Sequence, residues 1–285
     1  MRKRLASSML SCVLALLPLA ASAGTAPARM VALGGDITEI VYALDAQQGL
    51  VGVDSTSLWP AATRQLPDVG YVRQLAAEGV LSLRPQLILA THDAGPPAVI
   101  SQLRDAGVRI EVMPTTRTPA AVVAKVRQVG QVLGRKPAAD ALAGKLEVEY
   151  ADLARAVAAM PRHPRVLFLL SAGAGSPKAA GQDTAADSAI ALAGGVNAAG
   201  AFTGYKAVSP ESLAVMAPDV IVLMRERAEE LGGVDGVLKL PGVALTPAGK
   251  ARRVELVDGQ ALLGFGPRNA EHELALQRSF VAAQP

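Results

Sequence analysis

Short apolar runs alternate with segments that carry an apolar residue every three or four positions. This pattern is typical of buried parallel strands separated by amphipathic helices. After the first run, Gly34 and Gly35 break the strand, and Asp36 with Glu39 has the spacing of a helix capping box. The expected strands are residues 30–33, 50–53, 87–90, 108–113, 166–170, 220–223 and 254–257, and the expected helices begin at 36 or cover 76–82, 98–106, 118–133, 184–192 and 270–281.

Residues 138–160 follow a different pattern, because they form one long helical stretch in which Gly144 is the only glycine. A helix of about 20 residues spans about 30 Å, the diameter of a small domain. We therefore predict two α/β lobes with mainly parallel sheets, residues 24–136 and 162–285, joined by a single helix over 137–161. The apolar positions of this helix are Leu142, Leu146, Tyr150, Leu153 and Val157.

An internal repeat supports the two lobes. Glu78 precedes Pro85 by seven residues, and Glu211 precedes Pro218 by the same number. In both copies a short apolar helix leads through the proline into a buried strand. Two such lobes bind a ligand in the crevice between them, at the carboxyl ends of the strands. The loops after residues 33, 53, 90, 170 and 223 are therefore the expected cleft walls.

The amino-terminal residues indicate export. Residues 2–4 are basic, residues 5–20 are uncharged and mainly apolar, and small residues flank the expected cleavage site near Ala23. This is the pattern of a secretory signal, so we expect a periplasmic protein. Cys12 would leave with the signal, so a mature chain without cysteine could form neither a disulfide nor a thiolate site. Taking the three basic residues from 28 leaves 25, equal to the 25 acidic residues, which removes any argument for nucleic-acid binding.

Motifs of common enzymes are absent from the sequence. The glycine-rich segment 171–177 lacks the Gly-Lys-Ser/Thr ending of a phosphate loop, and there is neither a Gly-x-Ser-x-Gly elbow nor a His-Glu-x-x-His helix. Of the three histidines, His163 and His272 are expected at the surface and His92 in a loop after a strand, which argues against a metal site built from several histidines. We expect a binding protein and keep an exported α/β enzyme as an alternative.

The segment Gly70-Tyr71-Val72-Arg73 offers a specific chemistry. In an extended conformation, Tyr71 and Arg73 would project to the same side of the chain. Tyrosine is a known axial ligand of haem iron, and a nearby guanidinium favours the phenolate form or pairs with a haem propionate. Arg225 and Arg227 follow an expected strand of the second lobe and are further candidates to meet an anionic ligand group.

The sequence resembles the periplasmic haem-binding proteins of bacterial haem ABC importers over essentially the whole mature chain. Gly70-Tyr-Val-Arg73 is the most specific part of the resemblance, whereas cobalamin- and ferric-siderophore-binding proteins share the rest more loosely. The matching segments are residues 30–44, 51–57, 69–73, 180–186, 233–247 and 262–268.

This resemblance implies a monomer with two α/β lobes and little hinge motion. It implies that Tyr71 is the axial haem ligand and that Arg73 supports the phenolate or a propionate. It also implies that Glu78 and Glu211 dock onto a membrane permease, which is coupled to its ATPase. Some relatives carry a histidine after the first strand of the second lobe, where this chain has residues 170–173 without one. We therefore expect one haem, bound by Tyr71 on one face.

Other ligands and roles stay open at this point. Cobalamin or a ferric siderophore would require a wider cleft with aromatic walls, for which Trp59 and Phe265 are the plausible contributors. A haem chaperone or sensor that works without a transporter is a further alternative, and the two glutamates of the repeat distinguish it from an importer component.

Overall fold

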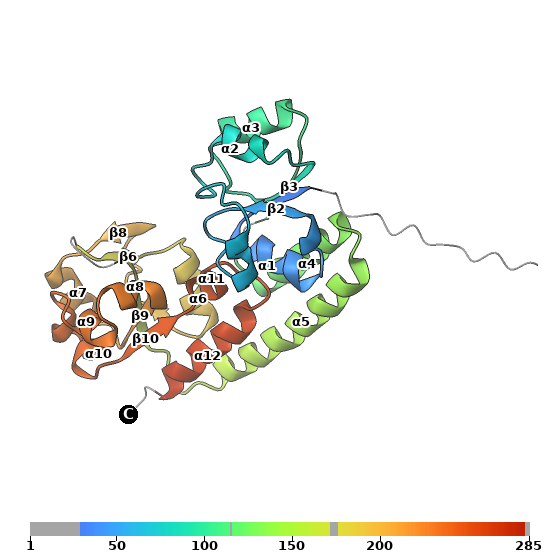
Figure 1. The fold of residues 1–285 in the computed structure, drawn as a ribbon. Coiled ribbons are helices and arrows are strands. Elements are labelled where there is room, and N and C mark those ends of the chain that lie inside the picture. The colour runs from blue at the N-terminus through green and yellow to red at the C-terminus, as the bar shows by residue number, and fades with distance from the viewer. Residues whose placement is uncertain (1–28, 115, 172–175, 283–285) are drawn as a thin grey trace, which may run out of the picture.

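The computed structural model describes residues 29–114, 116–171 and 176–282. The expected signal, residues 1–23, and residues 172–175 of the glycine-rich segment lie outside the described residues. The described chain forms two α/β lobes connected by the long helix α5 (Lys136–Ala158), as Figure 1 shows. This confirms the expected fold class. The assignment of residues 24–136 and 162–285 to the two lobes remains a proposal.

The first lobe contains a four-stranded sheet in which every neighbouring pair is parallel. Its order is β2-β1-β3-β4, formed by Met30–Leu33 (β1), Leu50–Val53 (β2), Leu87–Thr91 (β3) and Arg109–Met113 (β4). Helices cover both faces of this sheet (Figure 1). They are α1 (Gly35–Ala43), α2 (Ala77–Ser82), α3 (Pro97–Asp105) and α4 (Pro119–Val132), with short 3-10 turns at Gln47–Gly49 and Ala61–Gln65.

The second lobe repeats this parallel arrangement and extends it. Its parallel strands are Arg165–Ser171 (β5), Val196–Asn197 (β7), Val220–Met224 (β9) and Val254–Val257 (β10). Two further strands are Lys178–Ala180 (β6), which pairs antiparallel with β5, and Tyr205–Ala207 (β8), which pairs antiparallel with β6. The sequence did not reveal β6 and β8, because each has only three residues and a period of two cannot be recognised over that length.

The helices of the second lobe surround this mixed sheet. The order is α6 (Ala185–Leu192), α7 (Pro210–Met216), α8 (Arg225–Glu230), α9 (Val234–Leu238), α10 (Pro247–Lys250), α11 (Gly259–Leu263) and α12 (Asn269–Ala282), with a 3-10 turn at Val243–Leu245. Among the described residues, no helix combines the length and the apolar character that crossing a membrane requires.

The internal repeat is visible in the backbone. β9 begins and ends 133 residues after β3, and α7 begins 133 residues after α2. The residue before each proline has a left-handed conformation, with φ of 46° at Arg84 and 43° at Ala217. The strand order β2-β1-β3-β4 of the first lobe corresponds to β7-β5-β9-β10 in the second. The two lobes are therefore copies of the same parallel βαβ unit.

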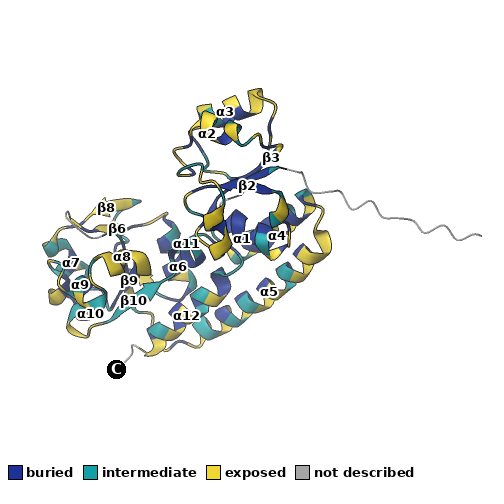
Figure 2. Ribbon diagram, in the orientation of Figure 1, coloured by how far each residue is buried: buried dark blue, intermediate teal, exposed yellow. Residues whose placement is uncertain are grey.

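One continuous apolar core joins the lobes. Side chains alternate across each strand, so Met30 and Ala32 face this shared core, whereas Val31 and Leu33 face α2 and α3. The second lobe contributes in the same way through β5, where Phe168 is fully buried. Figure 2 shows the buried residues concentrated in the strands and on the inner sides of α5 and α12. The cleft is thus built on a common base rather than on two independent bodies.

Candidate functional site

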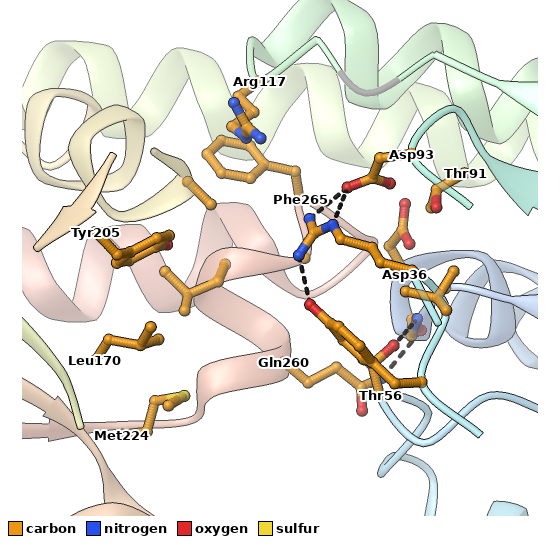
Figure 3. A pocket seen from close by; sticks show the side chains of 18 of the residues that line it. Asp36, Thr56, Thr91, Asp93, Arg117, Leu170, Tyr205, Met224, Gln260 and Phe265 are labelled. Carbon is orange, nitrogen blue, oxygen red and sulfur yellow. Dashed lines mark hydrogen bonds and ion pairs between the residues drawn. The ribbon is translucent and has the colours of Figure 1, made fainter. Parts of the chain in front are cut away.

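A cleft of about 650 Å³ lies between the lobes and is lined by residues of both. In Figure 3, Leu170, Tyr205 and Met224 of the second lobe lie on one side, and Thr91 and Asp93 of the first lobe lie on the other. As expected from the parallel sheets, most of these residues lie at or just after the carboxyl end of a strand.

A hydrogen-bonded chain of three side chains forms one wall of the cleft. Nη1 of Arg73 donates to the phenolic oxygen of Tyr71 at 2.6 Å, and Nε of Arg73 donates to Oδ2 of Asp93 at 2.8 Å. Nη2 of Arg73 also forms an ion pair with Asp93. Partial burial opposes the charge of Arg73, but the hydrogen bond and charge of Asp93 outweigh burial and raise the pKa of the guanidinium. The phenol of Tyr71 therefore faces a fixed positive charge.

Tyr71 and Arg73 meet through a turn rather than through an extended segment. The amide of Gln74 donates to the carbonyl of Tyr71 at 2.7 Å, and that of Gly95 donates to the carbonyl of Val72 at 2.9 Å. The segment is therefore not extended, the condition under which the sequence would place the two side chains on one side, but they still lie together. The turn follows Gly70, whose φ of 93° is a conformation that favours glycine.

The structure separates the two candidate arginines of the second lobe. Arg227 lines the cleft and forms an ion pair of 2.7 Å with Glu230 on the same helix. Arg225 is not a lining residue, and its Nη2 donates to the carbonyl of Leu256 at 3.2 Å. Arg117, which the sequence analysis did not identify, lines the cleft from the first lobe.

A buried ion pair lies at the base of the cleft. Lys125 of α4 pairs with Asp36 of α1, and its Nζ also donates to the carbonyl of Phe265 at 3.2 Å. Asp36 therefore does not take part in a capping box: Gly34 precedes α1 and no side chain caps it. The resemblance of Asp36 and Glu39 to a capping box was misleading, because both carboxylates serve contacts between distant segments.

Glu39 is the centre of a polar network that connects the lobes. Its Oε1 accepts from Arg268 Nη2 at 2.6 Å and from Gln260 Nε2 at 2.8 Å. Gln260 also binds the first lobe through the amides of Leu58 and Trp59, at 2.6 and 2.9 Å. The guanidinium of Arg268 stacks 4.4 Å from the centre of the Trp59 ring. Trp59 is thus engaged by Arg268, and it does not line the cleft.

Of the remaining sequence candidates, Phe265 is buried and lines the cleft. His92 is exposed and is not a lining residue. Glu78 and Glu211 are exposed in the first turns of α2 and α7. These helices lie at the far ends of the two lobes (Figure 1). The side chain of Ser209 caps α7, and its hydrogen bond lowers the pKa of Glu211.

Comparison with known proteins agrees with this architecture. The family model described as periplasmic binding protein matches residues 30–261. The chain belongs to the periplasmic binding protein family.

Solved structures of periplasmic binding proteins resemble the chain over most of its length. The periplasmic heme-binding protein RhuT from Roseiflexus sp. RS-1, in apo form, is 41% identical, covers 91% of this chain and 99% of its own, and has a TM-score of 0.85. The periplasmic heme-binding protein BhuT in complex with two hemes is 40% identical, covers 90% and 98%, and has a TM-score of 0.84. The vitamin B12-binding protein of Photorhabdus laumondii is more distant, at 26% identity over 75% of this chain and 77% of its own.

Three cleft residues of this periplasmic binding protein were not identified from the sequence. Tyr205 and Arg117 line the cleft, and Gln260 both lines it and connects the lobes. For Tyr205 a signal existed, since Gly204-Tyr205 repeats the Gly70-Tyr71 pair. Arg117 and Gln260 lie in segments with no recognisable motif, so their role depends on a fold that only the structure reveals.

The network around Glu39 makes a prediction about stability. Burial raises the pKa of Glu39, and the hydrogen bond and charge of Arg268 act against that rise. Arg268→Met should therefore leave a buried carboxylate unpaired and lower the free energy of unfolding by about 3–5 kcal/mol near neutral pH. A buried acid with a raised pKa loses stability as pH increases, so this penalty should shrink on acidification towards the ordinary pKa of glutamate.

Urea unfolding at several pH values measures this effect. Arg104→Met, which removes an arginine from the last turn of α3, is the control and should change stability by less than about 0.5 kcal/mol. Glu39→Gln in the Arg268→Met background should recover part of the loss. A penalty independent of pH would contradict the electrostatic role of Arg268.

Proposed function

We propose that this periplasmic binding protein captures ferric haem in its cleft and delivers it to an ABC importer of the inner membrane. The observation that carries the proposal is the phenol of Tyr71 in the cleft wall, 2.6 Å from the guanidinium of Arg73. Support comes from the two heme-binding proteins above, which are 40% and 41% identical to this chain over nearly their whole length.

Tyr71 supplies the iron ligand in this proposal. A phenolate oxygen suits ferric iron, but phenol ordinarily ionises near pH 10. The iron itself favours the anion, and the charge of Arg73 favours it further. Asp93 holds Arg73 in place through Nε and Nη2, which leaves Nη1 directed at the phenolic oxygen.

Arginines that line the cleft can bind the two propionate carboxylates of haem. Guanidinium groups bind carboxylates through paired hydrogen bonds, and Arg117 and Arg227 line the cleft on opposite lobes. Arg227 and Glu230 lie three residues apart on one helix, and their ion pair is exposed. Such pairs contribute little to stability, so Arg227 can exchange Glu230 for a propionate at a small cost in free energy. We do not assign Arg225 to haem, because it binds the carbonyl of Leu256 outside the cleft lining.

Cobalamin is the second candidate ligand. The vitamin B12-binding protein of Photorhabdus laumondii shares 26% identity with this chain, so the same frame can accommodate a corrin in a relative. The cleft of this chain instead presents the Tyr71–Arg73 pair. A ferric siderophore is the remaining alternative of the same class, and of the two aromatic residues expected to form its walls, Phe265 lines the cleft and Trp59 does not.

Delivery and location complete the proposal. We infer that residues 1–23 are a signal removed near Ala23, that the mature protein is a periplasmic monomer, and that it has no catalytic activity of its own. Glu78 and Glu211 occupy equivalent positions in the two copies of the repeat, on exposed helix starts at the far ends of the molecule. Two carboxylates so placed can bind matching basic residues of a two-part permease.

The role of Tyr71 makes the first prediction of this proposal. Wild-type protein titrated with ferric haem should show a charge-transfer band from phenolate to iron during the first equivalent. Tyr71→Phe removes only the ligating oxygen, so it should abolish that band and weaken binding by more than about 100-fold, or about 2.7 kcal/mol. Arg73→Met removes the supporting hydrogen bond and should weaken binding by about 10–100-fold.

Tyr42→Phe is the matched control, because Tyr42 lies on α1 and does not line the cleft. It should titrate like the wild type. Equal affinity and equal spectra for Tyr71→Phe and the wild type would show that Tyr71 is a wall residue, and would favour cobalamin or a siderophore as ligand.

Docking through the two glutamates makes a separate prediction. Replacing both Glu78 and Glu211 by arginine should reduce haem-dependent growth or transport into membrane vesicles by about tenfold or more, because like charges then meet at the permease. Haem affinity in solution should stay unchanged, since neither residue lines the cleft.

The control replaces two other exposed carboxylates, Glu147 on α5 and Glu271 on α12, by arginine. It matches the change in net charge and should leave transport unaffected. Transport by the Glu78→Arg, Glu211→Arg protein at the wild-type rate would favour a haem chaperone or sensor over an importer component.

A further inference from the structure

A second cavity, of about 150 Å³, lies in the second lobe at the amino ends of its parallel strands. The cleft between the lobes is lined from the carboxyl ends of the same strands, so the two cavities lie at opposite edges of the sheet. Two basic segments meet here: residues 162–164, Arg-His-Pro, precede β5, and residues 250–253, Lys-Ala-Arg-Arg, precede β10. This basic pocket is lined chiefly by Arg162, His163, Asp219, Val220, Arg253 and Phe280.

Positive charge predominates in the basic pocket. Arg162 and Arg253 contribute two guanidinium groups, whereas Asp219 is the one carboxylate among the described residues that line it. Oδ2 of Asp219 accepts a hydrogen bond of 2.9 Å from the amide of Arg165, which holds this carboxylate at the start of β5. The two guanidinium charges therefore exceed the single negative charge before His163 is counted.

The walls of the basic pocket are held in place by the fold. Val220 of β9 and Phe280 of α12 are buried and form its apolar part. Nδ1 of His163 lies 2.7 Å from the carbonyl oxygen of Gly194, and because a carbonyl oxygen can only accept, Nδ1 is the donor. Groups fixed in this way lose little conformational entropy when a ligand binds.

The internal repeat provides a comparison for Arg253. The pairing of β3 with β4 and of β9 with β10 makes Arg253 the equivalent of Arg109 in the first lobe, and Glu255 the equivalent of Glu111. Arg109 forms an ion pair of 2.8 Å with Glu111. Within the described part of the chain, Arg253 forms no such pair with Glu255, whose pKa is raised by burial alone. Arg253 lines the basic pocket instead.

We propose that the basic pocket is a binding site for a phosphate group, separate from the cleft. Guanidinium groups bind phosphate oxygens through paired hydrogen bonds, and the planar fork of arginine matches their geometry. The volume of about 150 Å³, against about 650 Å³ for the cleft, restricts the ligand to a small anion or to the head of a larger molecule. Inorganic phosphate and the head group of an anionic phospholipid share this chemistry.

Calorimetric titration of the mature protein with inorganic phosphate, in chloride buffer of constant ionic strength, tests the proposal. The wild type should bind phosphate saturably, with a Kd of about 1 mM or tighter. Arg253→Met should weaken binding by about tenfold or more, because it removes a charged hydrogen-bond donor. Arg253→Lys keeps the charge but loses the paired donors, so it should bind with intermediate affinity, and it serves as the second variant should Arg253→Met not fold.

Arg109→Met is the matched control, because Arg109 is the equivalent residue of the first lobe and does not line the basic pocket. It removes the same charge and should bind phosphate like the wild type. Both variants at Arg253 should bind haem with unchanged affinity, since Arg253 does not line the cleft. Failure of this proposal is therefore distinguishable from failure of the proposed function.

Sedimentation with vesicles of phosphatidylglycerol or of phosphatidylcholine identifies the source of the phosphate group. Binding of inorganic phosphate without retention on either vesicle indicates a small soluble anion. Retention on phosphatidylglycerol vesicles that Arg253→Met abolishes indicates a lipid head group, and either result supports the proposal.

Two results would overturn it. One is the absence of saturable phosphate binding up to about 10 mM together with no retention on vesicles that depends on Arg253. The other is an equal loss of binding in Arg253→Met and Arg109→Met, which would show a response to net charge rather than a site.

Discussion

The apolar core shared by the two lobes is the constraint on which the cleft depends. Side chains from β1, β3, β5 and β9 pack into one cluster with α5 and α12, so neither lobe has an independent base on that side. Rotating one lobe against the other would expose part of this cluster to water, at about 25 cal/mol for each Å² of apolar surface. The Glu39–Arg268–Gln260 network fastens the lobes at a second place, next to the cleft. Together these contacts oppose wide hinge motion.

A frame that moves little suits a rigid, flat ligand. A cleft held at a fixed width does not lose conformational entropy when the ligand enters, and this loss is a main cost of binding. The polar groups of the wall are fixed in the same way, because the turn that carries Tyr71 and Arg73 is hydrogen-bonded to Gly95 and Asp93 of the neighbouring loop. The chain therefore holds the phenol of Tyr71 and its cationic groups in place before a ligand arrives.

The hydrophobic pattern predicted the parallel strands of four or more residues and the long connecting helix, because these elements have enough residues to show a pattern, but it did not predict the two-residue parallel strand β7. The 133-residue repeat of Glu78 and Glu211 also appeared in the sequence and corresponds to equivalent helices. The short antiparallel strands β6 and β8 could not be recognised in the sequence, and Tyr205, which begins β8, was therefore not identified. Asp36 and Glu39 were misinterpreted, since local spacing suggests a cap and only the tertiary structure shows their partners Lys125 and Arg268.

Of the candidate site, the sequence pointed to the Tyr71–Arg73 pair, on the condition of an extended segment that the structure does not contain. The phenol of Tyr71 and the guanidinium of Arg73 still lie close together, because a turn brings them together as well as an extended strand would. Arg225 and Arg227 could not be distinguished from their sequence, because both follow the same strand. The start of α8 directs one toward the cleft and the other toward the carbonyl of Leu256.

The most direct test of the account is calorimetric titration of the mature protein with ferric haem and, separately, with cobalamin. A fixed cleft with a phenol in its wall should select haem over cobalamin. Haem should bind with submicromolar affinity, which corresponds to more than about 8 kcal/mol, and cobalamin should give no saturable heat. Tighter binding of cobalamin than of haem would contradict the account, and Tyr71 would then be a wall residue in a corrin-binding cleft.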